Sequence, residues 1–136
     1  MAHVLFVCLH NAGRSQMSRA LFDRAAGGRH SSDSAGSIAD PAGTLHPEVI
    51  EVMREIGIDL ADRRPQRLDD DLAGRADVVV TMGCGDTCPF YPGTRYLDWA
   101  LDDPAGQGVD AVRPIRDQID VLVQALLAEL LHEQEA

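Results

Sequence analysis

The sequence contains no lysine, and all 12 of its basic residues are arginines. Acidic residues number 22, so the chain has a formal net charge of −10 and a pI of about 4.7. Nucleic acids and anionic membranes bind proteins through a basic face, which a chain of this charge lacks. We therefore expect neither a nucleic acid nor a membrane among its partners.

Long apolar runs, internal repeats, low-complexity tracts and linkers are also missing from the sequence. No run approaches the roughly 18 residues of a membrane helix, and the apolar residues 4–7 are too few for a signal-peptide core. A length of 136 residues, 45% of them hydrophobic and 25% charged, fits one globular domain. The sequence predicts a single, monomeric, cytoplasmic domain over residues 1–136.

Cysteine is scarce, with only Cys8, Cys84 and Cys88 present. An odd number fits poorly with a framework of structural disulfides, and a cytoplasm keeps thiols reduced. A domain of this size also folds without disulfides or a metal ion. The three thiols are therefore candidates for chemistry.

Alternating strand and helix patterns predict an α/β fold. Strands are expected over residues 3–7, 29–34, 77–82 and 94–99, and helices over residues 14–26, 47–56 and 110–132. Pro114 is expected in the first turn of the last helix. The alternation predicts a mostly parallel sheet with helices on both faces. Ligands of such sheets bind beyond the carboxyl ends of the strands, where the loops hold all three cysteines.

Residues 8–15 connect the first predicted strand to the first predicted helix. A short loop that closes onto a helix N-terminus directs backbone N–H groups inward and can cradle an anion. Arg14 offers a planar fork for two oxygens of a tetrahedral oxyanion. Cys8 then lies in a positive site that favours a nucleophilic thiolate, to which the Ser15 hydroxyl can donate a hydrogen bond. The predicted oxyanion site consists of Leu9, His10, Asn11, Ala12, Gly13 and Arg14.

A simpler interpretation of this loop is that Cys8 is an inert, buried residue at a strand end. Arg14 and Ser15 would then only open a helix. The coincidence of a strand, Cys8, a five-residue loop, Arg14, Ser15 and a helix favours the functional interpretation. His10 fits the rim of the site better than the role of a general base.

These motifs resemble the low-molecular-weight protein tyrosine phosphatase family, and more closely its arsenate reductase branch. The matching stretches are residues 4–8, 11, 13–17, 34–36, 77–82 and 102–106. The resemblance implies a three-layer α/β sandwich with a four-stranded parallel sheet flanked by helices, and no cofactor. It also implies Cys8 as nucleophile, Arg14 as oxyanion ligand and Asp103 as general acid. A potassium site, for which some relatives use a Glu early in the first helix, is not expected because Arg19 stands there.

A leaving oxygen needs a proton, which a carboxylic acid on a mobile loop can supply. Asp102 and Asp103 are both candidates, and the resemblance selects Asp103, which leaves Asp102 as a solvated turn residue. The phosphatases place aromatic residues after the following proline, whereas this sequence has Ala105 and Gly106. A rim of small residues suits a small inorganic oxyanion and offers an aromatic ring nothing to stack on.

Cys84 and Cys88 suggest a thiol relay that follows the attack of Cys8 on arsenate. Cys84 attacks the Cys8 sulfur and releases arsenite, and Cys88 then attacks Cys84 and moves the disulfide to an accessible loop. Thioredoxin would reduce that disulfide; the alternative is a low-molecular-weight thiol such as mycothiol with a glutaredoxin-type protein, which would make Cys88 less essential. Only three residues separate the two cysteines, fewer than in thioredoxin-linked relatives. A zinc site would need Cys8 and His10 as further ligands and would leave the anion cradle without a role, so no metal is expected.

The predicted function is therefore the reduction of arsenate, with phosphate or sulfate as substrate analogues. The alternative is a phosphatase that acts on phosphotyrosine or a small phosphoester, because Cys8, Arg14 and Asp103 serve both reactions. Residual phosphatase activity would be compatible with the reductase. A sensor that captures arsenite through its thiols is a third possibility, although arsenite capture needs no anion cradle.

Overall fold

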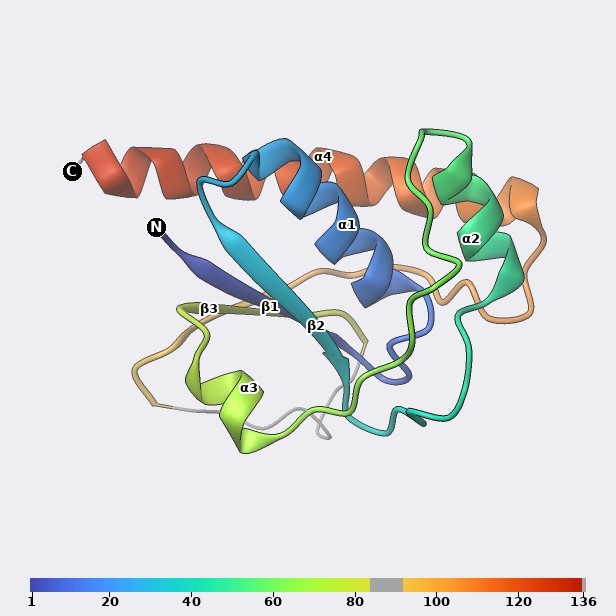
Figure 1. Cartoon of the computed structure of the whole chain (residues 1–136). Helices are drawn as coiled ribbons and strands as arrows, with labels where there is room; N and C mark the ends of the chain where they lie inside the picture. Colours follow the sequence, from blue (N-terminus) through green and yellow to red (C-terminus); the bar gives the residue numbers. More distant parts are fainter. Residues whose placement is uncertain (84–91, 136) are drawn as a thin grey trace.

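The computed structural model of the chain describes residues 1–83 and 92–135 and contains a central sheet with helices on both faces (Figure 1). The strands are β1 (His3–Cys8), β2 (Ser31–Gly36), β3 (Val78–Thr81) and β4 (Arg95–Asp98). They are parallel and lie in the order β2-β1-β3-β4. The predicted four-stranded parallel sheet is confirmed.

The central strand β1 supplies apolar side chains to two cores. Val4, Phe6 and Cys8 face the larger core, which is formed with α1 (Arg14–Ala26), α2 (Pro47–Arg54) and α4 (Val109–Glu135). Leu5 and Val7 face the smaller core, beneath α3 (Asp70–Gly74) (Figure 1). A strand that is buried on both faces has a continuous apolar sequence. The result is the three-layer arrangement that the sequence predicts.

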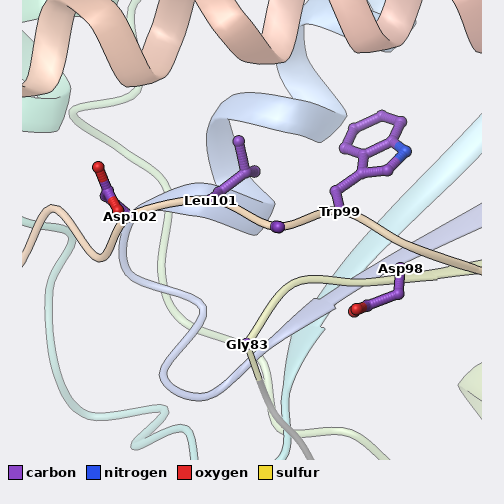
Figure 2. Close-up of a pocket in the computed structure, with 6 residues that line it drawn as sticks. Gly83, Asp98, Trp99, Leu101 and Asp102 are labelled. Atoms are coloured by element: carbon purple, nitrogen blue, oxygen red, sulfur yellow. The ribbon is translucent and has the colours of Figure 1, made fainter.

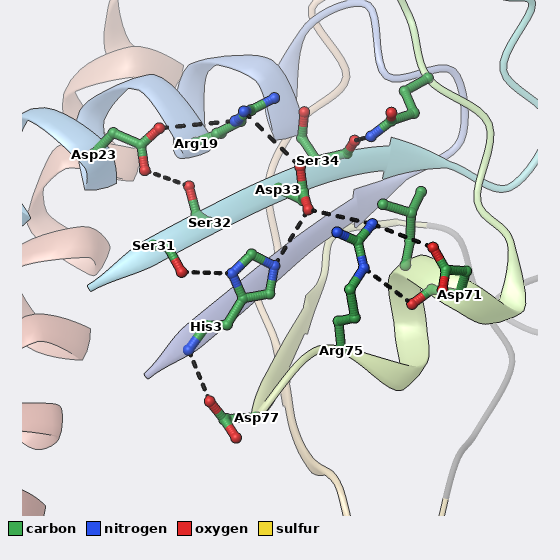
Figure 3. A network of polar contacts seen from close by, with 12 residues as sticks. His3, Arg19, Asp23, Ser31, Ser32, Asp33, Ser34, Asp71, Arg75 and Asp77 are labelled. Carbon is green, nitrogen blue, oxygen red and sulfur yellow. Dashed lines mark hydrogen bonds and ion pairs between the residues drawn. The ribbon is translucent and has the colours of Figure 1, made fainter. Parts of the chain in front are cut away.

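The edge strand β2 has the polar sequence SSDSAG, and several of its side chains have polar partners on β1 and α1 (Figure 3). Ser31 Oγ lies 2.6 Å from His3 Nδ1, and Asp33 Oδ2 lies 3.2 Å from His3 Nε2. Ser32 Oγ donates a hydrogen bond of 2.5 Å to Asp23 Oδ1 of α1. The strand lies two residues later than the predicted range 29–34, because pairing with β1 begins at Ser31.

Two helical segments differ from the sequence prediction. α3 has no predicted counterpart, because five residues are too few to show a helical period. Its start is set by Asp69, whose side chain accepts a hydrogen bond of 2.8 Å from the N–H of Leu72. α2 ends at Arg54, two residues earlier than predicted, and the turn that follows contains Gly57 with a φ of 83°.

The long helix α4 begins one residue earlier than predicted. The N–H groups of Ala111 and Val112 both donate to Gly108 O, at 3.0 and 3.1 Å, and this fixes the start of the helix. Pro114 therefore lies in the second turn, so the expectation that it lies in the first turn is wrong. Within residues 1–83 and 92–135, no helix has both the length and the apolar composition that crossing a membrane requires.

Candidate functional site

The loop of residues 9–13 lies at the carboxyl end of the sheet, between Cys8 at the end of β1 and Arg14 at the start of α1. Cys8 is 2% exposed and lines a small pocket with a cavity volume of about 10 Å³. The residues that line this pocket are Cys8, His10, Ala12, Gly13, Arg14, His46, Asp103 and Pro104. The structure thus brings Cys8, Arg14 and Asp103 to one place.

The main chain of the loop has a defined orientation. The carbonyl oxygens of Cys8, Leu9 and Ala12 accept hydrogen bonds of 3.0–3.1 Å from backbone N–H groups of residues 37, 38 and 46. In a trans peptide unit, the N–H of the next residue points opposite to the carbonyl, and the described chain has no cis peptide bond. The N–H groups of Leu9, His10 and Gly13 therefore point to the other side of the loop, as an anion cradle requires.

The Cys8 sulfur has two polar neighbours. Its Sγ lies 2.9 Å from Ser15 Oγ, and the backbone N–H of Asn11 donates to it at 3.3 Å. Asn11 has a φ of 53°, a left-handed conformation that asparagine tolerates better than most residues. The sulfur thus has one backbone N–H and one hydroxyl group within hydrogen-bond distance.

Gly36, the last residue of β2, pairs with Cys8 in the sheet and forms a junction of three main-chain segments. A Cβ atom on Gly36 would lie 2.6 Å from Leu9 O and 2.8 Å from Asn11 N. Its own N–H donates to Gln66 O at 2.8 Å. Because there is no room for a side chain, Gly36 allows the loop to lie directly against β2.

The guanidinium group of Arg14 is held from several sides, and the residue is only 6% exposed. Its Nη1 donates to Leu101 O at 3.4 Å, and its Nη2 lies 3.7 Å from Asp103 Oδ2. Gly83 lies so close that a Cβ atom there would come within 2.5 Å of Nη1, and its φ is +85°. Arg14 is therefore a fixed fork rather than a mobile surface cation.

Asp103 lies at the mouth of the pocket, and its side chain is 49% exposed. Its Oδ1 accepts a hydrogen bond of 2.9 Å from the N–H of Ala105, which fixes the turn. Pro104, the next residue, is buried against Gly13. A half-exposed carboxylate that faces an arginine across the pocket can exchange protons with solvent and still reach a bound oxyanion.

The neighbouring Asp102 does not line the pocket that contains Cys8. It borders a second, more open cavity of about 470 Å³, together with Gly83, Asp98, Trp99, Ala100 and Leu101 (Figure 2). Trp99 is 8% exposed, and its ring centroid lies 5.7 Å from that of Phe6, so it belongs to the core. Asp102 and Asp103 also line a further cavity together, so the difference between them is that Asp103 reaches the pocket of Cys8 as well.

His46 is a pocket residue that the sequence did not indicate. It is the N-cap residue of α2, and its N–H donates to Ala12 O at 3.0 Å. Its ring carbon Cδ2 would lie 3.3 Å from a Cβ on Gly13. Only folding brings it to a loop more than thirty residues earlier in the chain, so no local motif could have identified it.

Cys84 and Cys88, the two other predicted catalytic cysteines, lie outside the described residues. The described chain before them ends at Gly83, which contacts the Arg14 guanidinium. The roles of these two thiols therefore stay predictions.

Comparison with known proteins points to one family. Residues 3–136 match the family described as low molecular weight phosphotyrosine protein phosphatase. A putative arsenate reductase from Halobacterium salinarum is 43% identical over 127 residues, which cover 91% of this chain and 89% of that protein. A glutaredoxin arsenate reductase from Synechocystis is 32% identical over 133 residues, which cover 96% of this chain and 99% of that protein.

A solved structure gives the same relationship. The thioredoxin-dependent arsenate reductase from Corynebacterium glutamicum is 40% identical and superimposes with a TM-score of 0.81. The match covers 98% of this chain and 63% of the Corynebacterium chain. This chain thus spans less than two thirds of that protein's length.

Proposed function

Because the chain belongs to the low molecular weight phosphotyrosine protein phosphatase family, we propose that it is an arsenate reductase that uses Cys8 as its nucleophile. The observation that carries the proposal is the set of polar contacts around the buried Cys8 sulfur. Cys8 Sγ lies at the end of a backbone loop, with Ser15 Oγ at 2.9 Å and the Asn11 N–H at 3.3 Å. Arg14 supplies a fixed guanidinium in the same pocket. The two arsenate reductase relatives and the arsenate reductase structure support this activity.

In the first step, the Cys8 thiolate attacks the arsenic of arsenate. Backbone N–H groups of the loop from Leu9 to Arg14 bind the arsenate oxygens, while the Asn11 N–H donates to the Cys8 sulfur. The Arg14 fork binds two of these oxygens and neutralises their charge. A sulfur–arsenic bond forms, and the bond from arsenic to one hydroxyl oxygen breaks. Asp103 gives its proton to that oxygen, which leaves as water.

The second step transfers two electrons to arsenic. The Cys84 thiolate attacks the Cys8 sulfur, and a Cys8–Cys84 disulfide forms while the sulfur–arsenic bond breaks. The electron pair of that bond stays on arsenic, which leaves as arsenite. Cys88 then attacks the Cys84 sulfur, frees Cys8 and carries the disulfide away from the pocket.

An external dithiol reduces the Cys84–Cys88 disulfide and restores the starting state. The names of the Corynebacterium and Synechocystis relatives support thioredoxin and a glutaredoxin-type protein as candidates. A low-molecular-weight thiol such as mycothiol is a further candidate. We propose that a monomer carries out the whole cycle in the cytoplasm, where such reductants are found.

Phosphatase activity is the second candidate, since the family is described by that reaction. The same nucleophile, arginine and acid serve both reactions up to the covalent intermediate. Two features favour the reductase: the pocket is small, with a cavity volume of about 10 Å³, and Ala105 and Gly106 follow Pro104 where the phosphatases carry aromatic residues. A pocket of this kind accepts a free oxyanion more readily than an aromatic ester.

A single-turnover experiment tests the proposal. The fully reduced protein is mixed with stoichiometric arsenate, and both free thiols and arsenite are counted. We expect two thiols to be lost for each arsenite released, and Cys8→Ser to abolish both changes. The absence of arsenite, together with rapid hydrolysis of p-nitrophenyl phosphate, would replace the reductase with the phosphatase.

A further inference from the structure

The side chain of Asn11 has a single orientation in the site. Its Oδ1 accepts two hydrogen bonds, one of 2.9 Å from Gln16 Nε2 and one of 2.8 Å from the backbone N–H of Gln66. Both partners are donors, so the carboxamide oxygen must face them. The Asn11 amide nitrogen then faces Ser15.

This orientation determines the direction of the next hydrogen bond. Asn11 Nδ2 donates to Ser15 Oγ at 2.6 Å, so the serine oxygen acts as an acceptor toward Asn11. A serine hydroxyl has one hydrogen. With Asn11 as its donor, Ser15 has that hydrogen available for a Cys8 thiolate, whose Sγ lies 2.9 Å away and can only accept.

Gln16, in turn, cannot rotate its own amide without loss. Its Nε2 donates both to Asn11 Oδ1 and to Arg64 O, at 2.9 and 3.1 Å, and both of these neighbours are acceptors only. Gln16 is 2% exposed, and its Oε1 has no hydrogen-bond partner among the described residues. The orientation of the Gln16 amide is therefore set by its two N–H groups, which both have acceptors, while its oxygen has none in the described part of the chain.

We infer that Gln16 is a positioning residue for the Cys8 thiolate and acts on it through Asn11 and Ser15. Its N–H group orients the Asn11 carboxamide, the carboxamide orients the Ser15 hydroxyl, and the hydroxyl donates to the sulfur. The Gln66 N–H supports the same orientation from the main chain. The role in catalysis rests on the proposed function, but the effect on Cys8 is measurable without arsenate.

The experiment measures the alkylation rate of Cys8 by iodoacetamide against pH, in a chain that also carries Cys84→Ser and Cys88→Ser so that Cys8 is its one thiol. We expect Gln16→Met to lower the rate at pH 7 by about tenfold, as the loss of a directed hydrogen bond to a charged group does. The midpoint of the pH profile should move to higher pH. Ser15→Ala should also lower the alkylation rate and raise the midpoint, by at least as much as Gln16→Met.

The double variant distinguishes positioning from a merely structural role. If Gln16 acts through Ser15, adding Gln16→Met to Ser15→Ala changes the alkylation profile no further, whereas independent effects add. Gln66→Met is the matched control, because it removes an amide side chain from the same cluster but keeps the N–H that Asn11 uses. It should leave the profile unchanged.

Additive effects of the two substitutions, or a Gln16→Met profile equal to that of the parent, would overturn the inference. Thermal unfolding shows whether each variant is folded. If Gln16→Met does not fold, Gln16→Glu keeps the shape of the side chain and puts an acceptor in place of the donor, with the same expected result at neutral pH. A normal set of alkylation results in a protein that releases no arsenite would count against the proposed function and not against this inference.

Discussion

Gly13 and Pro104 are in such close contact that a Cβ atom on Gly13 would lie 2.7 Å from Pro104 Cγ. This contact joins the loop that contains the Cys8 sulfur to the loop that contains Asp103. The ion pair of 3.7 Å between Arg14 and Asp103 lies beside it. The position of the candidate acid relative to the nucleophile therefore depends on the missing side chain of Gly13.

We expect Gly13→Ala to reduce kcat by at least about tenfold, because the new methyl group pushes Pro104 and Asp103 away and misplaces the acid. Arsenite release under saturating arsenate measures the effect. Gly74→Ala is the control, because nothing lies within 4 Å of a Cβ at that position in α3. Its kcat should be unchanged and its stability equal or higher by up to about 1 kcal/mol. Equal kcat values for Gly13→Ala and the parent would show that the loops do not depend on this contact.

Arg14→Lys should lower kcat/KM on the order of a hundredfold, since an ammonium group cannot replace a bidentate fork and each lost charged hydrogen bond weighs about 1.5–3 kcal/mol. Steady-state arsenite release with an external dithiol measures this loss. Arg54→Lys makes the same change at an exposed arginine, which pairs with Asp59 at 3.4 Å. That control should retain full activity. A near-normal kcat/KM for the Arg14→Lys variant would contradict the assignment of Arg14 as the oxyanion ligand.

Asp103→Asn should slow formation of the covalent adduct by about 10²–10⁴-fold, the range for loss of a general acid. The protein should stay folded, because the side chain is half exposed and an amide oxygen can still accept from the Ala105 N–H. Rapid-mixing measurement of thiol loss tests the rate, and thermal unfolding tests the fold. Asp102→Asn, outside the pocket that contains Cys8, is the matched control and should react at the parental rate. An equal loss of rate in the two variants would contradict the role of Asp103 as the general acid.

The stability of the fold should decrease as pH falls below about 6.5, in part because of His30. Burial lowers the pKa of His30 from its ordinary value of 6.5, with smaller contributions from the N-terminal amine and Arg29. Its Nδ1 accepts a hydrogen bond of 3.0 Å from the Ala2 N–H, which only an unprotonated nitrogen can do. The unfolded chain therefore binds a proton at a pH where the folded chain does not, and acid favours unfolding.

His30→Asn keeps an acceptor near Ala2 but removes the titration. We expect its urea midpoint to change less between pH 7.5 and 5.5 than the midpoint of the parent. At pH 8.5 the histidine is neutral in both states, so any difference there reports packing alone. Identical pH slopes for the parent and the variant would assign the acid sensitivity to other groups.

Apolar periodicity and turn residues predicted the parallel sheet and its three longer helices, because burial on both faces leaves a continuous apolar sequence at β1. The polar strand β2 was harder to place, since Ser31 and Asp33 are paired with His3, which only the fold brings near. α3 is stabilised by an N-cap and two buried apolar residues, and it is too short to show a helical period in the sequence.

The spacing from Cys8 to Ser15 identified the candidate nucleophile and oxyanion loop because every member lies within one short stretch of chain. His46 and Gln66 were missed for the opposite reason: each contacts the loop across a long stretch of sequence, 55 residues for Gln66 and Asn11. Gln16 was noticed only as part of a family motif. Its use as a donor to Asn11 depends on the left-handed backbone of Asn11, which a sequence does not specify.

The junction at Gly36 has a consequence for the kinetics of folding. It joins the end of β1, the oxyanion loop and the segment around Gln66, while Arg14 contacts Leu101, 87 residues away. Contacts of such separation form late, because each must close a long loop of chain. During refolding, helix signals should return before Cys8 regains its reactivity, and the thiol becomes competent only when the last of these distant segments has docked.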